Sequence, residues 1–282
     1  MGRAKEILQM LKNIMRYSLF PVYELDDIAS GDNPAKKVQY DHTIAKEELK
    51  ETLRILSWNI LRNYNPEKIH DSLKAIFAQQ NPTVIFIQEA PVHETSSFWE
   101  GPLLERFNFY YAPLHQVKKK SAYYDFLSTG QLILSSHPMK KTKTYQLPSV
   151  SGQLMGDEHV IKRIALYAQL EKKDGRTVGL YNVHFENNCW HTGRKKQVEF
   201  LCDLVEENAD DIVVIGGDFN TFLYRAESGL TLLEHLGFER LMSGFRFLPR
   251  LDHFFVKGAN AQGFQLYGSG SDHQPIMVEI DF

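Results

Sequence analysis

The apolar residues of the chain gather into short runs, and several of these runs end at a polar side chain. The clearest run is residues 213–220, VVIGGDFN, in which three apolar residues and two glycines lead to Asp218, and a fourth apolar residue separates it from Asn220. A continuous apolar run of this length is typical of a strand covered on both faces. The glycines permit close backbone approach or unusual torsion angles, so both polar side chains can project beyond the strand. Taken alone, the segment fits a strand followed by an Asx turn equally well.

The same arrangement recurs in five other segments. An apolar run begins or ends at Asn, Glu, Asp or His in 53–59 (LRILSWN), 83–89 (TVIFIQE), 178–184 (VGLYNVH), 251–256 (LDHFFV) and 271–280 (SDHQPIMVEI). The runs at 130–136 and 163–170 predict two neighbouring strands of an antiparallel section. Six strands with polar ends predict one shared site.

Three segments have the apolar spacing of helices with one buried face. Pro66 opens the first helix, which runs to about Gln79. The second begins near Arg194, and the third covers 229–238 and ends at Gly237. Because the first helix lies between two predicted strands, the order indicates a βαβ-like unit and a mixed sheet with helices outside.

The first 50 residues differ from the rest of the chain. Residues 4–20 carry a helical stripe of apolar side chains, which favours a helix docked on the main domain; a membrane-surface or partner-binding helix is the alternative. Residues 26–50 are polar and contain turn formers, as in a linker with a short charged helix at 44–51. We therefore expect an N-terminal helical extension and linker over 1–50 and one larger domain over 51–282.

Residues 93–128 are expected to form loops and a helix, and they combine aromatic residues with lysines. Tyr110 and Tyr111 precede Lys118, Lys119 and Lys120. Such a mixture can stack on and neutralise a nucleotide or a lipid headgroup. Core aromatic residues beside a solvated lysine loop explain it as well.

Composition and charge limit the class of protein. With 282 residues, 43% of them hydrophobic and 12% aromatic, the chain can bury a sizeable core. The net charge of −3 argues against tight, sequence-independent binding of long nucleic acid driven by net charge, although local patches can still provide it. The two cysteines, Cys189 and Cys202, form no framework of disulfides or zinc ligands. No apolar run approaches the length of about 18 residues that spans a bilayer, and residues 1–20 lack a secretory core, so we expect a cytoplasmic protein.

The side chains at the strand ends point to chemistry on phosphate. Carboxylates and amides offer oxygen ligands for a hard cation, and two imidazoles can transfer protons or stabilise charge. This set suits magnesium, which prefers a few carboxylates and takes other ligands from water and substrate phosphate. Phosphoester hydrolysis needs an oriented water molecule and positive charge near the developing oxyanion. The sequence therefore predicts a magnesium-dependent phosphoester hydrolase.

Two arginines are candidates for contact with the substrate. Arg163 stands at the head of the run 163–170, where it can bind a phosphate with two hydrogen bonds or pair with an acid. Arg194 is followed by Lys195 and Lys196 at the expected start of a helix. Cations are unfavourable there unless an anion binds, which is a hint of a phosphate-facing loop.

Six short motifs occur in a recognisable order: WN at 58–59, QE at 88–89, NVH at 182–184, GDFN at 217–220, RLD at 250–252 and SDH at 271–273. Together they resemble the motif set of the endonuclease/exonuclease/phosphatase superfamily, which has the fold of pancreatic deoxyribonuclease. The resemblance covers residues 53–282. It implies a four-layered α/β/β/α sandwich, with two mixed sheets flanked by helices and the site at one rim. By the same resemblance, Glu89, assisted by Asn59 and Asp272, would hold magnesium, with manganese as a substitute.

The resemblance also implies catalytic roles. Asp218 would orient or deprotonate the attacking water, and Asn220 and His184 would contact the scissile phosphate. His273, supported by Asp252, would stabilise the transition state or act as an acid–base partner. For Asp252, an ordinary surface acid at the start of a strand stays open as an alternative.

Subgroup motifs bear on the substrate. Leu251, Asp252 and His253 stand where inositol polyphosphate 5-phosphatases typically have Cys-Asp-Arg, and GDFNT followed by Phe222 does not closely match apurinic endonucleases. A nucleic-acid or nucleotide-type diester is the leading interpretation. A phospholipid, sphingomyelin-type or phosphoinositide phosphohydrolase is the alternative, suggested by the amphipathic segment 4–20. A catalytically silent binding module is a third class, but such modules usually lose site residues, and here every expected strand end is filled.

Overall fold

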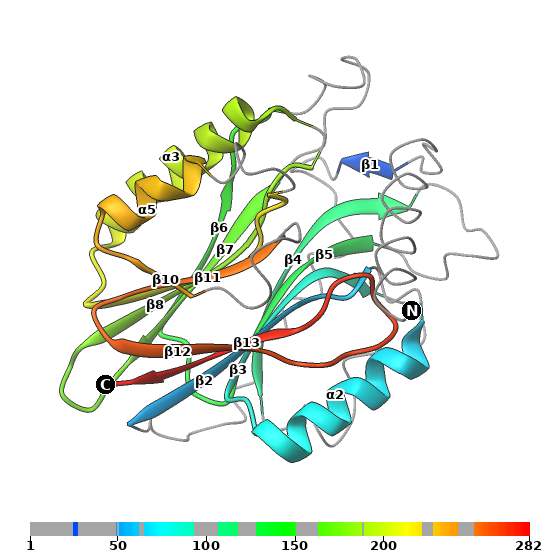
Figure 1. The fold of residues 1–282 in the computed structure, drawn as a ribbon, viewed down its shortest axis with the longest axis horizontal. Coiled ribbons are helices and arrows are strands. Elements are labelled where there is room, and N and C mark those ends of the chain that lie inside the picture. Colours follow the sequence, from blue (N-terminus) through cyan, green and yellow to red (C-terminus); the bar gives the residue numbers. More distant parts are fainter. Residues whose placement is uncertain are drawn as a thin grey trace, which may run out of the picture.

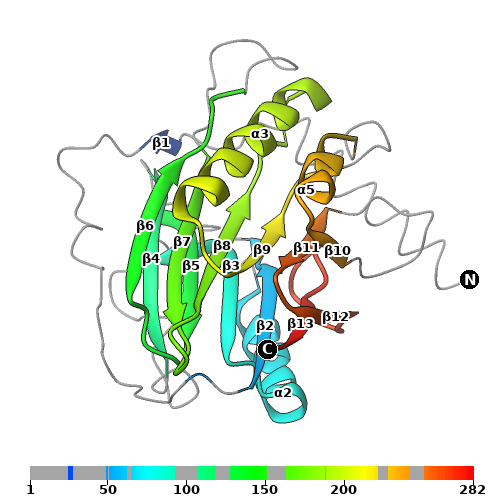
Figure 2. The ribbon, with the colours of Figure 1, turned by 90° about the vertical axis from the view of Figure 1, so that its left-hand side faces the viewer.

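The described part of the chain folds into two β-sheets that pack face to face and carry helices on their outer faces (Figure 1). The computed structural model describes residues 25–27, 49, 51–61, 65–92, 107–117, 128–150, 163–187, 189–221, 228–241 and 251–282. Helix α2 (Pro66–Gln80) covers the first sheet. Helices α3 (His191–Asn208) and α5 (Thr231–His235), the latter preceded by the 3-10 turn Ser228–Leu230, cover the second (Figure 2). This confirms the four-layered sandwich.

The first sheet has seven described strands, in the order β1 (Leu25–Asp27), β4 (Asn108–Val117), β5 (Ser128–Ser135), β3 (Val84–Val92), β2 (Thr52–Asn59), β13 (Ile276–Asp281) and β12 (Asn260–Gln265). The second has six, in the order β10 (Glu239–Leu241), β11 (Asp252–Lys257), β9 (Ile212–Asp218), β8 (Thr177–His184), β7 (Ile164–Glu171) and β6 (Lys141–Gln146). One pair in each sheet is parallel, β2 with β3 and β8 with β9, and both sheets are therefore mixed.

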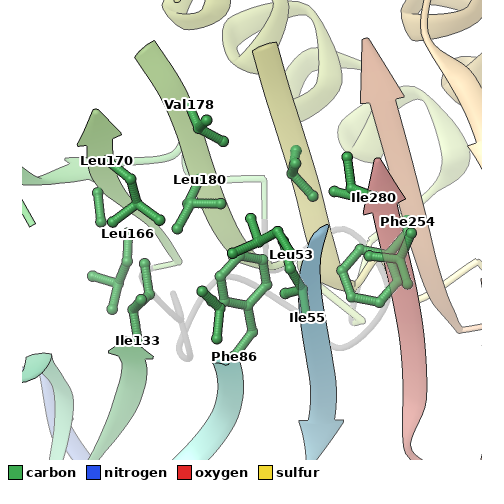
Figure 3. Close-up of a cluster of buried hydrophobic side chains, with 14 of the residues drawn as sticks. Leu53, Ile55, Phe86, Ile133, Leu166, Leu170, Val178, Leu180, Phe254 and Ile280 are labelled. Carbon is green, nitrogen blue, oxygen red and sulfur yellow. The ribbon is translucent and has the colours of Figure 1, made fainter. Parts of the chain in front are cut away.

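Alternation along buried strands supplies two apolar surfaces from one run of sequence. In β2, Ile55 faces the other sheet, whereas the next residue, Leu56, packs in the cluster beneath α2. In β11, Phe254 and Phe255 divide in the same way between the inter-sheet core and the layer under α3 and α5. Successive side chains of a strand point to opposite faces, which explains why these strands appear as continuous apolar runs. Figure 3 shows the inter-sheet core, to which both sheets contribute.

The parallel pairs bring the polar strand ends to one rim. In β2 and β3, Asn59 stands beside Gln88. In the second sheet, Asp218 is paired with His184 on one side and with Asp252 on the other. The strand ends that the sequence predicts to share a site therefore lie in register within each sheet.

A polar network joins the two sheets beneath this rim. The side chain of Gln88 donates to Oδ1 of Asn182 (2.7 Å), and Nδ2 of Asn182 donates to the carbonyls of Ile87 (3.1 Å) and Leu132 (2.9 Å). Gln88 and Asn182 are both fully buried. These members of the QE and NVH motifs are therefore structural, because they satisfy buried polar groups across the sheet interface.

The structure corrects several sequence-based boundaries. Part of the segment 93–128, which is expected to form loops and a helix, forms β4, and residues 141–146, to which no element is assigned above, form the edge strand β6. Residues 25–27, assigned to the extension and linker, pair with β4 as β1. Helix α3 begins at His191 instead of near Arg194. Residues 271–275 form a loop, and β13 starts only at Ile276.

Some expectations fall on other parts of the chain. The helix expected at 4–20 and Lys118, Lys119 and Lys120 lie outside the described residues, as does the helix expected at 44–51 apart from residues 49 and 51. Among the helices that the structure does describe, none is both long and apolar enough to cross a membrane.

The inter-sheet network predicts a stability effect. We expect Asn182→Ala to lower the free energy of unfolding by about 2 to 4 kcal/mol, because a buried polar group left without a partner costs about 1 to 3 kcal/mol and three groups bond to this side chain. Urea denaturation followed by fluorescence measures the change. Asn260→Ala, on the exposed edge strand β12, serves as the control and is expected to change stability by less than about 0.5 kcal/mol. Equal effects of the two substitutions would contradict the structural role of Asn182.

Candidate active site

Asp218 is the last residue of β9, and the local backbone turns sharply after it. Gly217 has φ of 141°, and a Cβ atom there would collide with the carbonyl oxygen of Val183 on β8. Asn220 adopts a left-handed conformation (φ 52°), and its N–H donates to Oδ1 of Asp218 (2.9 Å). The Asx turn considered from the sequence is therefore present, and it fixes the carboxylate. The Asn220 side chain donates to the carbonyl of Phe185 (2.8 Å).

Side chains from both sheets surround the second carboxylate oxygen of Asp218, Oδ2. Nδ2 of Asn59, from the first sheet, donates to Oδ2 at 3.0 Å. Nε2 of His184 lies 3.5 Å from the same oxygen and Nε2 of His273 lies 3.7 Å from it. Asp218 is fully buried, and the three side chains around this oxygen come from separate stretches of sequence. The structure therefore brings Asn59, His184, Asp218 and His273 together.

His273 is held in place from several sides. Its Nδ1 lies 2.8 Å from Oδ2 of Asp252, its carbonyl accepts from the indole N–H of Trp58 (3.0 Å), and its N–H donates to Oγ of Ser271 (3.1 Å). Ser271 in turn donates to the carbonyl of Asn59 (2.6 Å). Asp252 is thus a partner of the imidazole, as the resemblance implies, and not an ordinary surface acid.

The buried charges shift one another's pKa values. Burial raises the pKa of Asp218 to about 7; the neighbouring His273 cation opposes the shift and Asp252 adds to it. For His273, burial acts to lower the pKa, but the carboxylates of Asp252 and Asp218 raise it well above the usual 6.5. Burial therefore makes Asp218 a stronger base than an ordinary carboxylate, whereas its two carboxylate neighbours favour the cationic form of His273.

Arg163 and Arg194 lie in different surroundings. Nη1 of Arg163 is 3.0 Å from Nε2 of His184, and its Nε is 3.4 Å from a carboxylate oxygen of Glu186, so it is at the site and also paired with an acid. Nη1 of Arg194 donates to the carbonyls of Glu186 (3.2 Å) and Cys189 (3.1 Å). Those bonds stabilise the loop before α3, and a direct contact of Arg194 with substrate stays a prediction.

Two groups of side chains have the chemistry of cation ligands. Glu89 follows Gln88 in a left-handed conformation (φ 56°) where the pairing of β3 with β5 shifts register, and Asp272 is exposed beside Ser271. Their carboxylates and the amide oxygen of Asn59 are donor types that suit a hard cation, and Oδ1 of Asn59 also accepts from the N–H of Leu61 (3.0 Å). The second group is Asp218, Asp252 and His273, whose candidate ligand atoms lie within 4.8 Å of one another. Within this second group, Nδ1 of His273 and Oδ2 of Asp252 already lie 2.8 Å apart.

Sequence reasoning assigned no role to the supporting residues, although the WN and SDH motifs include two of them. Ser271, Trp58 and Glu186 each contact a site residue or its backbone. Glu186 follows His184 by two residues, but a single acid beyond a strand end carries no pattern that marks it as buried. The bond from Trp58 to His273 links positions 215 residues apart and has no local signal.

Comparison with known proteins places this site in a family. The model of the Endonuclease/Exonuclease/phosphatase family matches residues 56–273, a span that includes all six short motifs from WN at 58–59 to SDH at 271–273. The chain belongs to this family. Its members hydrolyse phosphoester bonds and are generally dependent on a divalent metal, and the chain is accordingly a phosphoester hydrolase. A comparison with curated proteins finds no match.

Solved structures agree with the family fold. A family member from Beutenbergia cavernae is 15% identical, with 83% of this chain and 72% of that chain covered and a TM-score of 0.63. The human nocturnin catalytic domain, with bound sulfate, is 19% identical, with 84% and 96% covered and a TM-score of 0.57. A mannosyl-6-phosphatase of Bacteroides thetaiotaomicron is 14% identical, with 82% and 100% covered and a TM-score of 0.54. At these identities the likeness concerns the fold alone.

The pairing of His273 with Asp252 predicts an effect on activity. We expect Asp252→Asn to lower kcat for a phosphoester substrate by about 10²-fold or more, because the imidazolium loses the carboxylate that orients and charges it. Steady-state kinetics with thermal unfolding as a fold check measure the change. Asp281→Asn is the matched control, since Asp281 is an exposed acid bonded to Thr52 on another part of the sandwich. A wild-type kcat in Asp252→Asn would contradict a role of Asp252 in supporting His273.

Proposed function

We propose that the protein is a divalent-metal-dependent phosphodiesterase that cleaves a nucleic-acid or nucleotide-type diester by in-line attack of water. The observation that carries the proposal is the convergence of Asn59, His184 and His273 on one oxygen of the buried Asp218. These groups supply a base, an amide donor, a second imidazole and a cation within one small region. In-line displacement at phosphorus requires that combination.

Each side chain has a role that fits its surroundings. Asp218 orients the attacking water and accepts its proton, which its raised pKa supports because a base works best with a pKa near the operating pH. His273, kept cationic by Asp252, faces the negative charge that develops on phosphate. Asn220, His184 and Arg163 are the candidates for contact with the phosphate oxygens.

Glu89, Asp272 and Asn59 are the residues proposed to hold the metal. They offer carboxylate and amide oxygens on neighbouring segments of the rim, and magnesium prefers such ligands, with manganese as a substitute. When bound, the ion supplies positive charge for phosphate oxygens and the leaving group.

The choice of a nucleotide-type substrate is supported by exposed aromatic side chains. Among the described residues, the exposed large hydrophobic side chains are Trp190 (57% exposed) and Tyr267 (85%). Trp190 lies in the segment that follows His184, and Tyr267 in the segment that precedes Ser271, so both come from segments leading to the site. Lys195 and Lys196 are exposed shortly after Trp190. Exposed rings beside lysines are typical of surfaces that stack bases and neutralise their backbone.

We expect hydrolysis of bis-p-nitrophenyl phosphate that requires magnesium or manganese and stops with EDTA. Asp218→Ala and His273→Ala should each lower kcat by about 10²- to 10⁴-fold, since each removes a proton-transfer or charge-stabilising group. Glu89→Gln should raise the metal concentration needed for half-maximal activity. Asp71→Ala, which removes an exposed acid of α2, is the control. Full activity in EDTA, or in a folded Asp218→Ala variant, would refute the proposed mechanism.

A substrate panel tests the substrate class. We expect cleavage of oligonucleotides or plasmid DNA to exceed release of headgroups from phosphatidylinositol or sphingomyelin vesicles, and to exceed hydrolysis of sugar phosphate monoesters. Trp190→Ala and Tyr267→Ala should raise KM for an oligonucleotide by about 5- to 100-fold, because stacking of one base contributes about 1 to 3 kcal/mol. Each variant should hydrolyse bis-p-nitrophenyl phosphate as the wild type does. Faster hydrolysis of vesicles or monoesters would replace the nucleotide-type substrate with that class.

A further inference from the structure

A second buried charge pair lies beside the proposed catalytic group, and its acid has no role in the mechanism above. Glu186 is fully buried, two residues beyond the end of β8, and its carboxylate is 3.4 Å from Nε of Arg163. The Arg163 side chain is also buried. A carboxylate removed from water is strongly destabilising unless a cation or several donors face it. The Glu186–Arg163 pair at the rim therefore forms in spite of the cost of removing both charges from water.

The backbone around Glu186 is fixed by three further contacts. Its N–H donates to the side chain of Gln197 (3.0 Å), and its carbonyl accepts from Nη1 of Arg194 (3.2 Å) and from Sγ of Cys189 (3.5 Å). Gln197 and Arg194 belong to α3, so the helix holds the loop that carries Glu186. The carboxylate therefore has a defined position from which to orient its partner.

Arg163 has a directed contact for each of its three nitrogens. Nε faces Glu186, Nη2 donates to Oδ1 of Asn187 (3.3 Å), and Nη1 is 3.0 Å from Nε2 of His184. The guanidinium is thereby fixed in one plane, with one edge toward the loop and Nη1 toward the catalytic group. The same Nε2 of His184 is 3.5 Å from Oδ2 of Asp218, so only the His184 side chain lies between Arg163 and Asp218.

This geometry determines the protonation state of His184. A guanidinium is always a hydrogen-bond donor, so Nε2 of His184 is the acceptor in its bond with Arg163. An imidazole that accepts at Nε2 is neutral and carries its proton on Nδ1. The fixed positive charge at this end of the site consequently belongs to Arg163 and not to His184.

We propose that Glu186 is a positioning residue: its buried carboxylate holds Arg163 against Nε2 of His184, so that His184 stays neutral and Arg163 presents the positive charge to the substrate phosphate. The inference rests on the proposed function for the identity of the substrate. The structural part of the inference is the protonation state of His184 and its dependence on Glu186. It can be tested whether or not the protein turns over a substrate.

Kinetics of a double-mutant cycle test the proposal. Glu186→Gln keeps the shape of the side chain but removes its charge, and it is expected to lower kcat/KM for bis-p-nitrophenyl phosphate by about 10- to 100-fold, the scale of a misplaced catalytic contact. In an Arg163→Ala background the same substitution should cost less than about 2-fold, since residues that act through one another are not additive. Glu186→Asp, which retains the charge, should recover part of the loss.

Asp210→Asn is the matched control for a purely structural effect. Asp210 also accepts two side-chain hydrogen bonds, from Tyr167 (2.9 Å) and Gln169 (2.7 Å), but it precedes β9 at the end of the strand opposite Asp218. The Asp210→Asn substitution should leave kcat/KM within about 2-fold of wild type. Wild-type activity in Glu186→Gln, or an equal loss in both backgrounds, would overturn the proposal.

Nitrogen NMR of the histidine rings provides a readout that needs no substrate. In protein labelled with ¹⁵N-histidine, assigned with a His184→Gln variant, His184 is expected to show an unprotonated Nε2 and a protonated Nδ1 near neutral pH. Glu186→Gln should weaken or remove this state. A protonated Nε2 in the wild type would overturn the inference whether or not the protein hydrolyses diesters. If no diester is hydrolysed but the ring has the expected state, the proposed function fails and the structural part of the inference stands.

Discussion

The site depends on a buried carboxylate whose donor comes from the opposite sheet. Asp218 lies at the end of β9, and Asn59, which donates to it, lies at the end of β2. A carboxylate in such a position is tolerated only where donors and cations face it. The distance between Asp218 and Asn59 is therefore set by how the two sheets stack. A shift of one sheet over the other would change the surroundings of Asp218, and also the contact of His273 with Asp252 on β11.

Packing and polar bonds together determine that stacking. The inter-sheet core provides most of the attraction, but apolar contacts alone specify position loosely. Gln88 and Asn182 add direction, because their hydrogen bonds are satisfied in only one alignment of β3 with β8. At Gly216 a Cβ atom would collide with the ring of Phe254, so the glycines before Asp218 also allow close packing on the inner face. The motif residues thus divide into those that bear chemistry and those that hold the sheets in register.

The parts of the fold that were predictable are those with a local signal. The helix from Pro66 and the apolar strands ending at Asn59, His184 and Asp218 follow from periodicity and from residue types at strand ends. Strand β6 was not predictable in this way, because most of its side chains are exposed and its sequence, KTKTYQ, reads as a solvated lysine segment. The buried state of Glu186 depends on Arg163 and on α3, which are distant in sequence. Such tertiary contacts leave no mark on the residues themselves.

The two cations of the site are each compensated before any substrate arrives. Arg163 faces Glu186, and His273 faces Asp252, while Asp218 lies between the two pairs. A compensated cation attracts a free anion less strongly than an isolated one, so this arrangement contributes little to ground-state binding. Its donors are nevertheless already oriented in a low-dielectric region, where they stabilise charge that develops during the reaction without reorganising. Preorganised donors of this kind favour the transition state over the bound substrate, which is the condition for an increase in kcat and not only for tighter binding.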